Sequence, residues 1–171
     1  MTEHHTITQR VTFRPCRRED LPDLEWFGRF ARYRQHFAEQ FERQLRGENA
    51  MLIAEANGFP VGRLSVDLAK RRQEATGVLW SFEVLPPLRS LGIGSHLIAM
   101  AEGMLRERDY RIAEIGAGKD NPDARRLYQR LGYRVVGDNF EEWDVTAPDG
   151  SVIHESSHEW ILRKVLEATP P

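Results

Sequence analysis

A loop between residues 84 and 95, with the sequence VLPPLRSLGIGS, has the composition of an anion-binding site. Glycine lacks a Cβ atom, so the backbone at Gly92 and Gly94 can approach a bound anion closely. The loop leads into a helical pattern of apolar residues, and the free N–H groups and dipole of a helix N-terminus attract phosphate. Arg89 adds a guanidinium group that suits phosphate oxygens. The loop is therefore a candidate phosphate site.

Two familiar phosphate loops do not fit these residues. A Walker A loop ends in Gly-Lys-Ser/Thr, whereas Gly94 is followed by Ser95 and His96. A dinucleotide-binding loop carries a third glycine three residues after the second, where this sequence has Leu97. The remaining interpretation is the pyrophosphate loop of an acetyl-CoA-dependent enzyme. The alternative is a glycine-containing turn that only caps a helix.

The elements around this loop follow from the spacing of apolar residues. Residues 77–84 predict a strand with Val78, Trp80, Phe82 and Val84 on one side and Leu79, Ser81 and Glu83 on the other. Apolar residues at helical spacing over 97–105 predict a helix, and a further strand is expected over 111–117. Asn121 and Pro122 then form the N-cap and first residue of a second helix. Its apolar stripe consists of Ala124, Leu127, Tyr128 and Leu131.

The flanking regions supply further strands and helices. A strand is expected over 9–15, two helices over 19–46 with a break near 28–34, and a hairpin of strands 50–56 and 61–68 joined at Asn57-Gly58. In strand 61–68, Leu64, Val66 and Leu68 are expected to point inward, and Arg63, Ser65 and Asp67 outward. A closing hairpin begins at 133–136, turns at 148–150 and returns over 160–165. This order predicts one α/β domain over residues 9–166, a mixed sheet with packed helices, and flexible ends at 1–8 and 167–171.

Two motifs in the second half resemble those of the GNAT superfamily of N-acetyltransferases. Val84-x-Pro86-x-x-Arg89-x-x-Gly92-Ile93-Gly94-Ser95 is similar to the acetyl-CoA motif of that family. Asn121-x-x-Ala124-x-x-Leu127-Tyr128-x-x-x-Gly132-Tyr133 is similar to its second motif. A helix and a strand separate the two, as in the family, and the resemblance covers residues 78–137. It implies the acyl-CoA N-acyltransferase fold, in which a mixed, mostly antiparallel sheet carries helices on both faces.

The resemblance also implies how the co-substrate acetyl-CoA is held. The end of the strand, including Phe82 and Val84, pairs through backbone groups with the pantetheine arm, and Asn121 hydrogen-bonds the same arm. Arg89 and the loop backbone hold the pyrophosphate, the loop residues being Ser90, Leu91, Gly92, Ile93, Gly94 and Ser95. A basic residue is frequent in the family at the position of Leu91, so this sequence lacks one charge contact there but keeps the amides.

Acetyl transfer to an amine needs a base for the ammonium proton and stabilisation of the departing thiolate. The resemblance places Tyr128 near the thioester sulfur, where its phenol, with a pKa of about 10, stays protonated at neutral pH and can act as the acid. Glu83, at the end of the strand, is the candidate base. The alternatives are core packing for Tyr128 and a solvated or ion-paired carboxylate for Glu83.

Composition excludes several other classes of function. The chain has 171 residues, with 24 Lys and Arg against 26 Asp and Glu, so it is not a globally basic nucleic-acid binder. Its one cysteine, Cys16, excludes an intramolecular disulfide and a cysteine-based zinc site, and fits a reducing, cytoplasmic setting. No apolar run approaches the roughly 20 residues of a membrane helix, so no membrane partner is expected. The six histidines show no ligand spacing, and no metal is expected.

The closing hairpin is acidic. Between residues 135 and 162 there is no Lys or Arg, and the acids are Asp138, Glu141, Glu142, Asp144, Asp149, Glu155 and Glu159. Such a field attracts cations, and Trp143 and Trp160 could add cation–π contacts. A cationic acceptor follows as a hypothesis, for example a polyamine, an aminoglycoside or a peptide amine. The alternative is an ordinary acidic surface with core tryptophans.

The sequence thus predicts an N-acetyltransferase that moves the acetyl group of acetyl-CoA to a primary amine, on a small molecule or a peptide, by direct attack in a ternary complex. The alternative from a different class is a catalytically silent, acyl-CoA-binding regulatory module. A donor with a longer acyl chain also remains open. The oligomeric state is open as well, with a homodimer among the alternatives.

Overall fold

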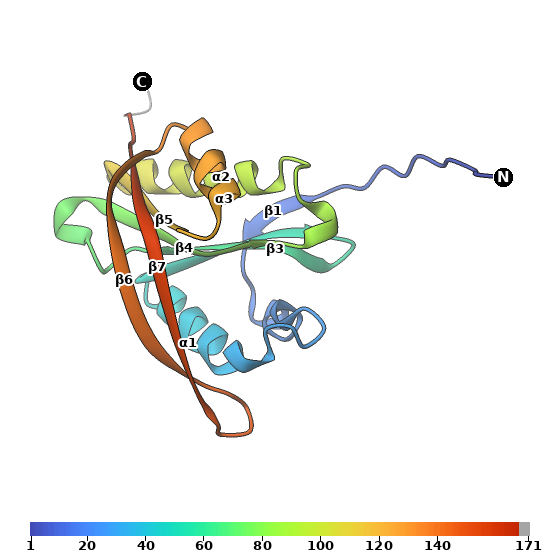
Figure 1. Cartoon of the computed structure of the whole chain (residues 1–171), viewed down its shortest axis with the longest axis horizontal. Coiled ribbons are helices and arrows are strands. Elements are labelled where there is room, and N and C mark those ends of the chain that lie inside the picture. Colours follow the sequence, from blue (N-terminus) through green and yellow to red (C-terminus); the bar gives the residue numbers. More distant parts are fainter. Residues whose placement is uncertain (168–171) are drawn as a thin grey trace.

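The computed structural model describes residues 1–167, and its strands form one seven-stranded sheet in the order β1-β2-β3-β4-β5-β7-β6 (Figure 1). The strands are β1 (Thr12–Pro15), β2 (Asn49–Ala56), β3 (Phe59–Asp67), β4 (Thr76–Val84), β5 (Ile112–Gly118), β6 (Arg134–Thr146) and β7 (Val152–Val165). The helices are α1 (Arg34–Leu45), α2 (Ile93–Glu107) and α3 (Pro122–Arg130), with short 3-10 helices η1 (Arg18–Glu25), η2 (Ala31–Tyr33), η3 (Arg72–Glu74) and η4 (Pro86–Leu88).

The sheet is mixed and mostly antiparallel, as expected. Only β4 and β5 run parallel, and every other neighbouring pair is antiparallel. Residues 1–8 are exposed and form no helix or strand. From residue 168 on, the flexible end expected at 167–171 lies outside the described residues.

Helices cover both faces of the sheet (Figure 1). On one face, α2 and α3 pack over the main core, and Gly62 on β3 approaches Ile93 and Leu97 of α2 so closely that a Cβ there would lie 3.2 Å from each side chain. On the other face, η1 and α1 enclose a second cluster around Leu24, Phe37 and Ile53. Strands β2 and β3 are therefore buried on both faces over almost their whole length.

This second layer makes one expectation about β3 wrong. Arg63 and Ser65 were expected to point outward, but both are buried, at 7% and 4% exposure. Their alternation with Leu64 and Val66 is real, yet it separates two buried faces rather than a core from solvent. Arg63 lies on the face covered by η1 and α1, where its side chain reaches the backbone of Leu24.

The middle of β4 carries a bulge that breaks the expected alternation. The register against β3 shifts between Arg63 and Ser65, and Ser81 has a positive φ of 49°. Leu79 and Val84, expected on opposite sides of the strand, both belong to the α2-side core. A bulge twists a strand and redirects the side chains beyond it. Here it turns the end of β4, with Phe82 and Glu83, toward the site described below.

The region of residues 19–46 holds only one α-helix, α1, because Pro22 lies inside the segment that forms η1.

The two hairpins match their expected positions. Asn57 and Gly58 both have positive φ, at 51° and 77°, as a type I′ turn requires. The closing hairpin of β6 and β7 is long and extends beyond α1 (Figure 1).

Candidate active site

A cleft opens in the middle of the sheet because β4 and β5 separate. Their parallel pairing runs only from Thr76–Leu79 against Ile112–Ile115, although both strands continue beyond it. Past Leu79, β4 is paired only with β3. An extended amide chain can add to such an unpaired strand edge by backbone hydrogen bonds. Phe82 and Val84, the predicted pantetheine contacts, lie on this part of β4.

The glycine-rich loop follows directly, and its backbone is arranged for an anion. Gly92 has a φ of +86° and is the N-cap of α2, and Ser90 also has a positive φ. The loop residues from Ser90 to Gly92 are exposed. The first N–H groups of α2 have no intrahelical acceptor and point out of the helix end. These features fit a pyrophosphate group, as the sequence predicted.

Arg89 is oriented differently from the expectation. Its Nε donates to the carbonyl oxygen of Val84 at 3.0 Å, and its Nη2 lies 3.4 Å from Oε2 of Glu83. The guanidinium group is half exposed, so a rotation would be needed to bring it to a phosphate. The backbone of the loop is therefore the better-placed part of the predicted phosphate site.

Tyr128 lies beside the cleft, in the last turn of α3. Asn121 caps this helix by accepting a hydrogen bond from Ala124 N at 3.1 Å, which leaves its side-chain N–H groups for another partner. The Tyr128 ring is 4% exposed and packs near Phe82 of β4, with ring centres 6.2 Å apart. Core packing and a role in chemistry are therefore compatible for this side chain.

The electrostatic environment of Tyr128 involves two carboxylates. Burial is the largest cause that raises the pKa of the Tyr128 phenol, and the negative charges of Glu159 and Glu83 raise it further. Glu83 comes from β4, and Glu159 comes from β7, where its carboxylate lies over Gly116 of β5. Burial and these two negative charges keep the Tyr128 phenol neutral at physiological pH.

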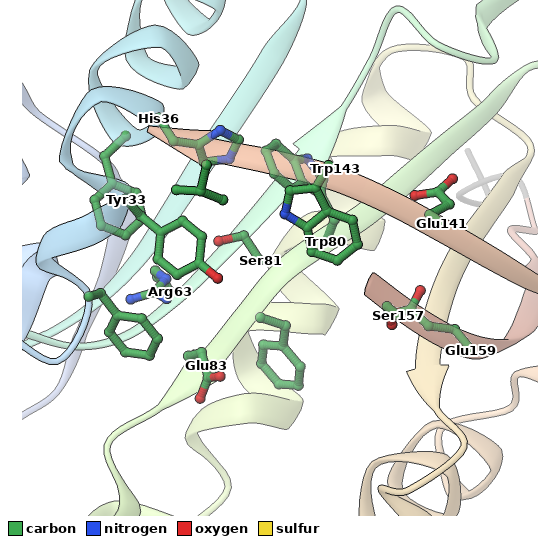
Figure 2. Close-up of a pocket in the computed structure, with 14 residues that line it drawn as sticks. Tyr33, His36, Arg63, Trp80, Ser81, Glu83, Glu141, Trp143, Ser157 and Glu159 are labelled. Carbon is green, nitrogen blue, oxygen red and sulfur yellow. The ribbon is translucent and has the colours of Figure 1, made fainter. Parts of the chain in front are cut away.

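A cavity of about 460 Å³ adjoins this point. Figure 2 shows that its labelled side chains come from the η2–α1 region, β3, β4 and the β6–β7 hairpin. It is lined by Phe30, Tyr33, His36, Phe37, Arg63, Trp80, Ser81, Phe82, Glu83, Glu141, Trp143, Val145, Ser157 and Glu159. This volume lies in the range of small-molecule sites, and the lining combines aromatic side chains with charged and polar ones.

Sequence reasoning predicted Phe82 and Glu83 in this region and named Glu159 and Trp143 for a cationic acceptor, but it missed Arg63 and the other aromatic walls as site residues. Glu159 was one of seven acids in the hairpin, and no local pattern distinguished it from the others. The face of β3 that carries Arg63 was expected to be exposed to solvent, but it is buried. The missing signal in both cases is tertiary, because the covering layer and the hairpin partner lie far away in the chain.

Most acids of the hairpin have basic neighbours from elsewhere in the fold. Asp138 lies 2.7 Å from Lys119 Nζ, and Glu155 lies 2.9 Å from Arg32 Nε. Glu142 and Asp144 flank His154, and Glu141 lies 3.6 Å from Lys70 Nζ. The acidic field expected from the sequence is thus partly neutralised, and Glu159 and Glu141 are its members that line the cavity.

Two features are absent from residues 1–167. No group of three or more His, Cys, Asp or Glu side chains in that range is arranged to hold a metal ion. None of the helices in the described part of the chain is both long and apolar enough to span a membrane.

Comparison with known proteins assigns the class. The model of the acetyltransferase (GNAT) family matches residues 16–133, well over half of the chain. The chain therefore belongs to the acetyltransferase (GNAT) family, and it has the mixed α/β fold described above.

Two curated relatives agree with this assignment. An uncharacterized N-acetyltransferase of Methanocaldococcus jannaschii is 26% identical over 77% of this chain, and the match spans 64% of that protein, which is less than two thirds. An aminoalkylphosphonate N-acetyltransferase of Salmonella typhimurium is 33% identical over 58% of this chain and 67% of its own length.

Solved structures show the same fold at low sequence identity. An N-acetyltransferase from Staphylococcus aureus Mu50 superposes with a TM-score of 0.72 at 17% identity, covering 92% of this chain and 99% of that one. An N-acetyltransferase from Thermoplasma acidophilum, solved in complex with coenzyme A, gives a TM-score of 0.69 at 13% identity, covering 91% and 99%.

Proposed function

We propose that this protein transfers the acetyl group of acetyl-CoA directly to a primary amine bound in the 460 Å³ cavity. The observation that carries the proposal is the position of this cavity beside the unpaired end of β4: Glu83 and Glu159 line it, and Tyr128 packs near Phe82, which lines it as well. The unpaired end of β4, with Phe82 and Val84, binds the pantetheine arm, and Asn121 donates to the same arm. The backbone from Ser90 to Ser95 binds the pyrophosphate, with Arg89 beside it.

Glu83 acts as the base in this proposal. Its side chain is 32% exposed and lines the cavity, so it can reach an ammonium group directly or through one water molecule. The amine arrives protonated and gives one proton to Glu83. Its nitrogen then attacks the thioester carbonyl, the C–N bond forms and the C–S bond breaks. The second nitrogen proton leaves with the sulfur as free thiol, and the proton on Glu83 returns to solvent.

Tyr128 stabilises the departing sulfur by donating a hydrogen bond. Complete transfer of its proton would be uphill, because a free thiol has a pKa of about 8.5 and that of a free phenol is already about 10. Burial and two carboxylates raise the pKa of Tyr128 further. Its role in the proposal is therefore that of a neutral, fixed donor and not of a proton store.

The acceptor is proposed to be a small amine that enters as a cation. The carboxylates of Glu83, Glu141 and Glu159 line the cavity and favour an ammonium group. The Salmonella relative is named for aminoalkylphosphonates, which are small amines of this kind. Polyamines, aminoglycosides and peptide amines are acceptors that the acidic hairpin would also attract, although most of its charges have basic partners.

The experiment is a panel of amines with acetyl-CoA, followed by release of free thiol and by mass spectrometry of the product. We expect a mass increase of one acetyl group on the amine and none on the protein, since transfer is direct. A protein that binds CoA but releases no thiol with any amine would contradict the proposal. An acetylated protein that forms before the amine is added would contradict direct transfer.

A further inference from the structure

The cavity described above contains a buried cation that the proposed reaction does not use. Arg63 is 7% exposed and lines the same cavity as Glu83 and Glu159. In Figure 2 Arg63 lies next to Tyr33 and Ser81. Trp80 lies between Arg63 and the two carboxylates of Glu141 and Glu159. Buried arginine is normally paired with a carboxylate, because an unpaired charge is costly to remove from water.

Arg63 lacks such a partner. Its Nη1 donates one long hydrogen bond of 3.3 Å to the carbonyl oxygen of Leu24, and its buried Nε has no hydrogen-bond partner within the described residues. Glu83 is its neighbour across the β3–β4 pair, but it influences Arg63 only through space and is itself 3.4 Å from Arg89. A guanidinium group has five N–H donors, so most of its capacity is unused.

The surroundings of Arg63 hold it in place without neutralising it. Its guanidinium carbon lies 4.2 Å from the ring centre of Phe30, 5.0 Å from that of Phe37 and 5.1 Å from that of Trp26. Aromatic faces attract a cation and fix its plane, but they accept no conventional hydrogen bond. Burial lowers the pKa of Arg63 to about 10, so the side chain is still charged at neutral pH. It is a preorganised, positively charged donor.

The cavity therefore has opposite charges at different places. Glu141 and Glu159 of the β6–β7 hairpin lie beyond Trp80 from Arg63 (Figure 2), and they favour the amine end of the acceptor. Arg63 offers a guanidinium group elsewhere on the same wall, and the usual partner of its planar fork is an oxyacid anion. Burial lowers the pKa of His36, which also lines the cavity, so its ring is neutral at physiological pH and does not compete as a cation.

We propose that Arg63 binds an anionic oxyacid group of the acceptor, a carboxylate or a phosphonate, so that the substrate is an amine carrying such a group at its other end. This inference rests on the proposed acetyl transfer and adds the chemical class of the acceptor. It also gives the unpaired guanidinium its partner, which is supplied by substrate rather than by the fold.

The test compares amines that differ only in their second group. The panel contains 3-aminopropanoate, 2-aminoethylphosphonate, propylamine and 1,3-diaminopropane, with homologues one and two carbons longer, and kcat/KM is measured for each by thiol release. We expect the best anionic amine to exceed the neutral amine of its length by at least about tenfold, the low end for a charge-assisted hydrogen bond. The carboxylate and phosphonate arms identify which anion fits.

Variants of Arg63 connect this preference to one side chain. Arg63→Met keeps the length and the aromatic contacts but removes the charge, and should reduce the ratio of kcat/KM for anionic over neutral amines at least tenfold. Arg63→Lys keeps the charge without the planar fork, and should give an intermediate ratio. Arg108→Met, at the exposed C-terminal end of α2, is the matched control and should leave the ratio unchanged.

A measurement on the unaltered protein keeps the inference testable if Arg63→Met does not fold. Propanoate and propylphosphonate carry the anionic group but lack the amine. At least one of them should inhibit acetylation competitively against the acceptor. Butanamide, a neutral analogue, should not inhibit. The inference would be overturned if kcat/KM for the best anionic amine is less than twice that for the neutral amine of its length. It would also be overturned if folded Arg63→Met keeps the same ratio of kcat/KM. Turnover of neutral amines or diamines alone would overturn it and leave the proposed function standing, whereas no thiol release with any amine would remove both.

Discussion

Gly94 of α2 lies directly against the ring of Phe82 of β4: a Cβ atom at Gly94 would be only 2.8 Å from Phe82 Cζ. At Gly92, two residues earlier, space is not the constraint, because nothing lies within 4 Å of a Cβ placed there. The constraint is the backbone, whose φ is +86°. The two glycines of the phosphate loop are therefore required for different reasons. Gly92 provides a backbone conformation, and Gly94 provides room for a residue that lines the acceptor cavity.

The first prediction separates these two roles. Gly92→Ala should raise the Kd for CoA roughly 5- to 30-fold, because a left-handed residue with a Cβ costs about 1–2 kcal/mol and the loop loses its fixed shape. Gly94→Ala should also change the acceptor KM, since the Phe82 ring must move. Calorimetric titration with CoA and steady-state kinetics measure the two effects. An unchanged CoA Kd in a folded Gly92→Val protein would remove the phosphate-loop assignment.

The second prediction concerns Tyr128. Tyr128→Phe keeps the ring that packs near Phe82 but removes the donor, so kcat should fall roughly 100-fold with little change in CoA affinity. Tyr133→Phe is the matched control, because the Tyr133 hydroxyl donates to Glu102 Oε1 at 3.0 Å within the core. That variant should lose about 0.5–1.5 kcal/mol of stability and keep its kcat. If Tyr128→Phe turns over at a near-normal rate, the role of Tyr128 is core packing and not stabilisation of the departing sulfur.

The sequence carried the information that is local. The Asn57-Gly58 turn, the helix that begins after Asn121 and the apolar stripe that includes Tyr128 all depend on neighbouring residues, and the structure has them where they were expected. The order of strands and helices predicted a mixed sheet with packed helices, and the family resemblance added that the sheet is mostly antiparallel with helices on both faces. The contacts that gather Glu83, Glu159 and Arg63 depend on which element covers which strand, and alternation in β3 could not show that its second face is buried.

The bulge in β4 illustrates the same limit. A strict alternation placed Leu79 with Glu83 and opposite Val84, but one extra residue at Ser81 changes the side on which the following residues lie. Nothing in the run Trp80-Ser81-Phe82 signals this, because serine is not a residue that favours positive φ. The position of Phe82 and Glu83 relative to the cleft is therefore a property of the folded pair of strands.

The third prediction distinguishes the two carboxylates beside Tyr128. Glu83→Gln should lower kcat at neutral pH, and part of the activity should return as pH rises, because a larger fraction of the amine is then already unprotonated. Glu159→Gln should mainly raise the acceptor KM, since its proposed role is to hold the ammonium group. Profiles of kcat and kcat/KM against pH measure both. Equal losses of kcat with identical pH profiles would contradict this division.

The fourth prediction tests attraction of cations by the hairpin. For amines without an anionic group, kcat/KM should fall as salt rises, more steeply for a diamine than for a monoamine, because screening limits exposed charges to about 8 Å at physiological ionic strength. Glu141→Lys, in the cavity wall, should raise the KM of these amines and leave that of acetyl-CoA nearly unchanged. Asp149→Lys, at the hairpin turn, is the control. A salt-independent kcat/KM for the diamine would exclude steering.

The last prediction concerns Cys16, the single thiol of the chain. It is 4% exposed, and burial is the largest cause that raises its pKa to about 12, followed by the negative charge of Asp20. The thiolate is the reactive form, so at pH 8 only about one molecule in 10⁴ carries it. The native protein should therefore not react with a disulfide thiol reagent at pH 8, and one thiol per chain should react after unfolding. Its reactivity should rise as pH approaches 12, provided the fold persists.

Cys16→Ala should keep kcat, because Cys16 lies in the cluster under η1 and α1 and takes no part in the proposed transfer. Rapid labelling of the native protein, or loss of kcat in a folded Cys16→Ala variant, would bring a covalent route through this residue back into consideration.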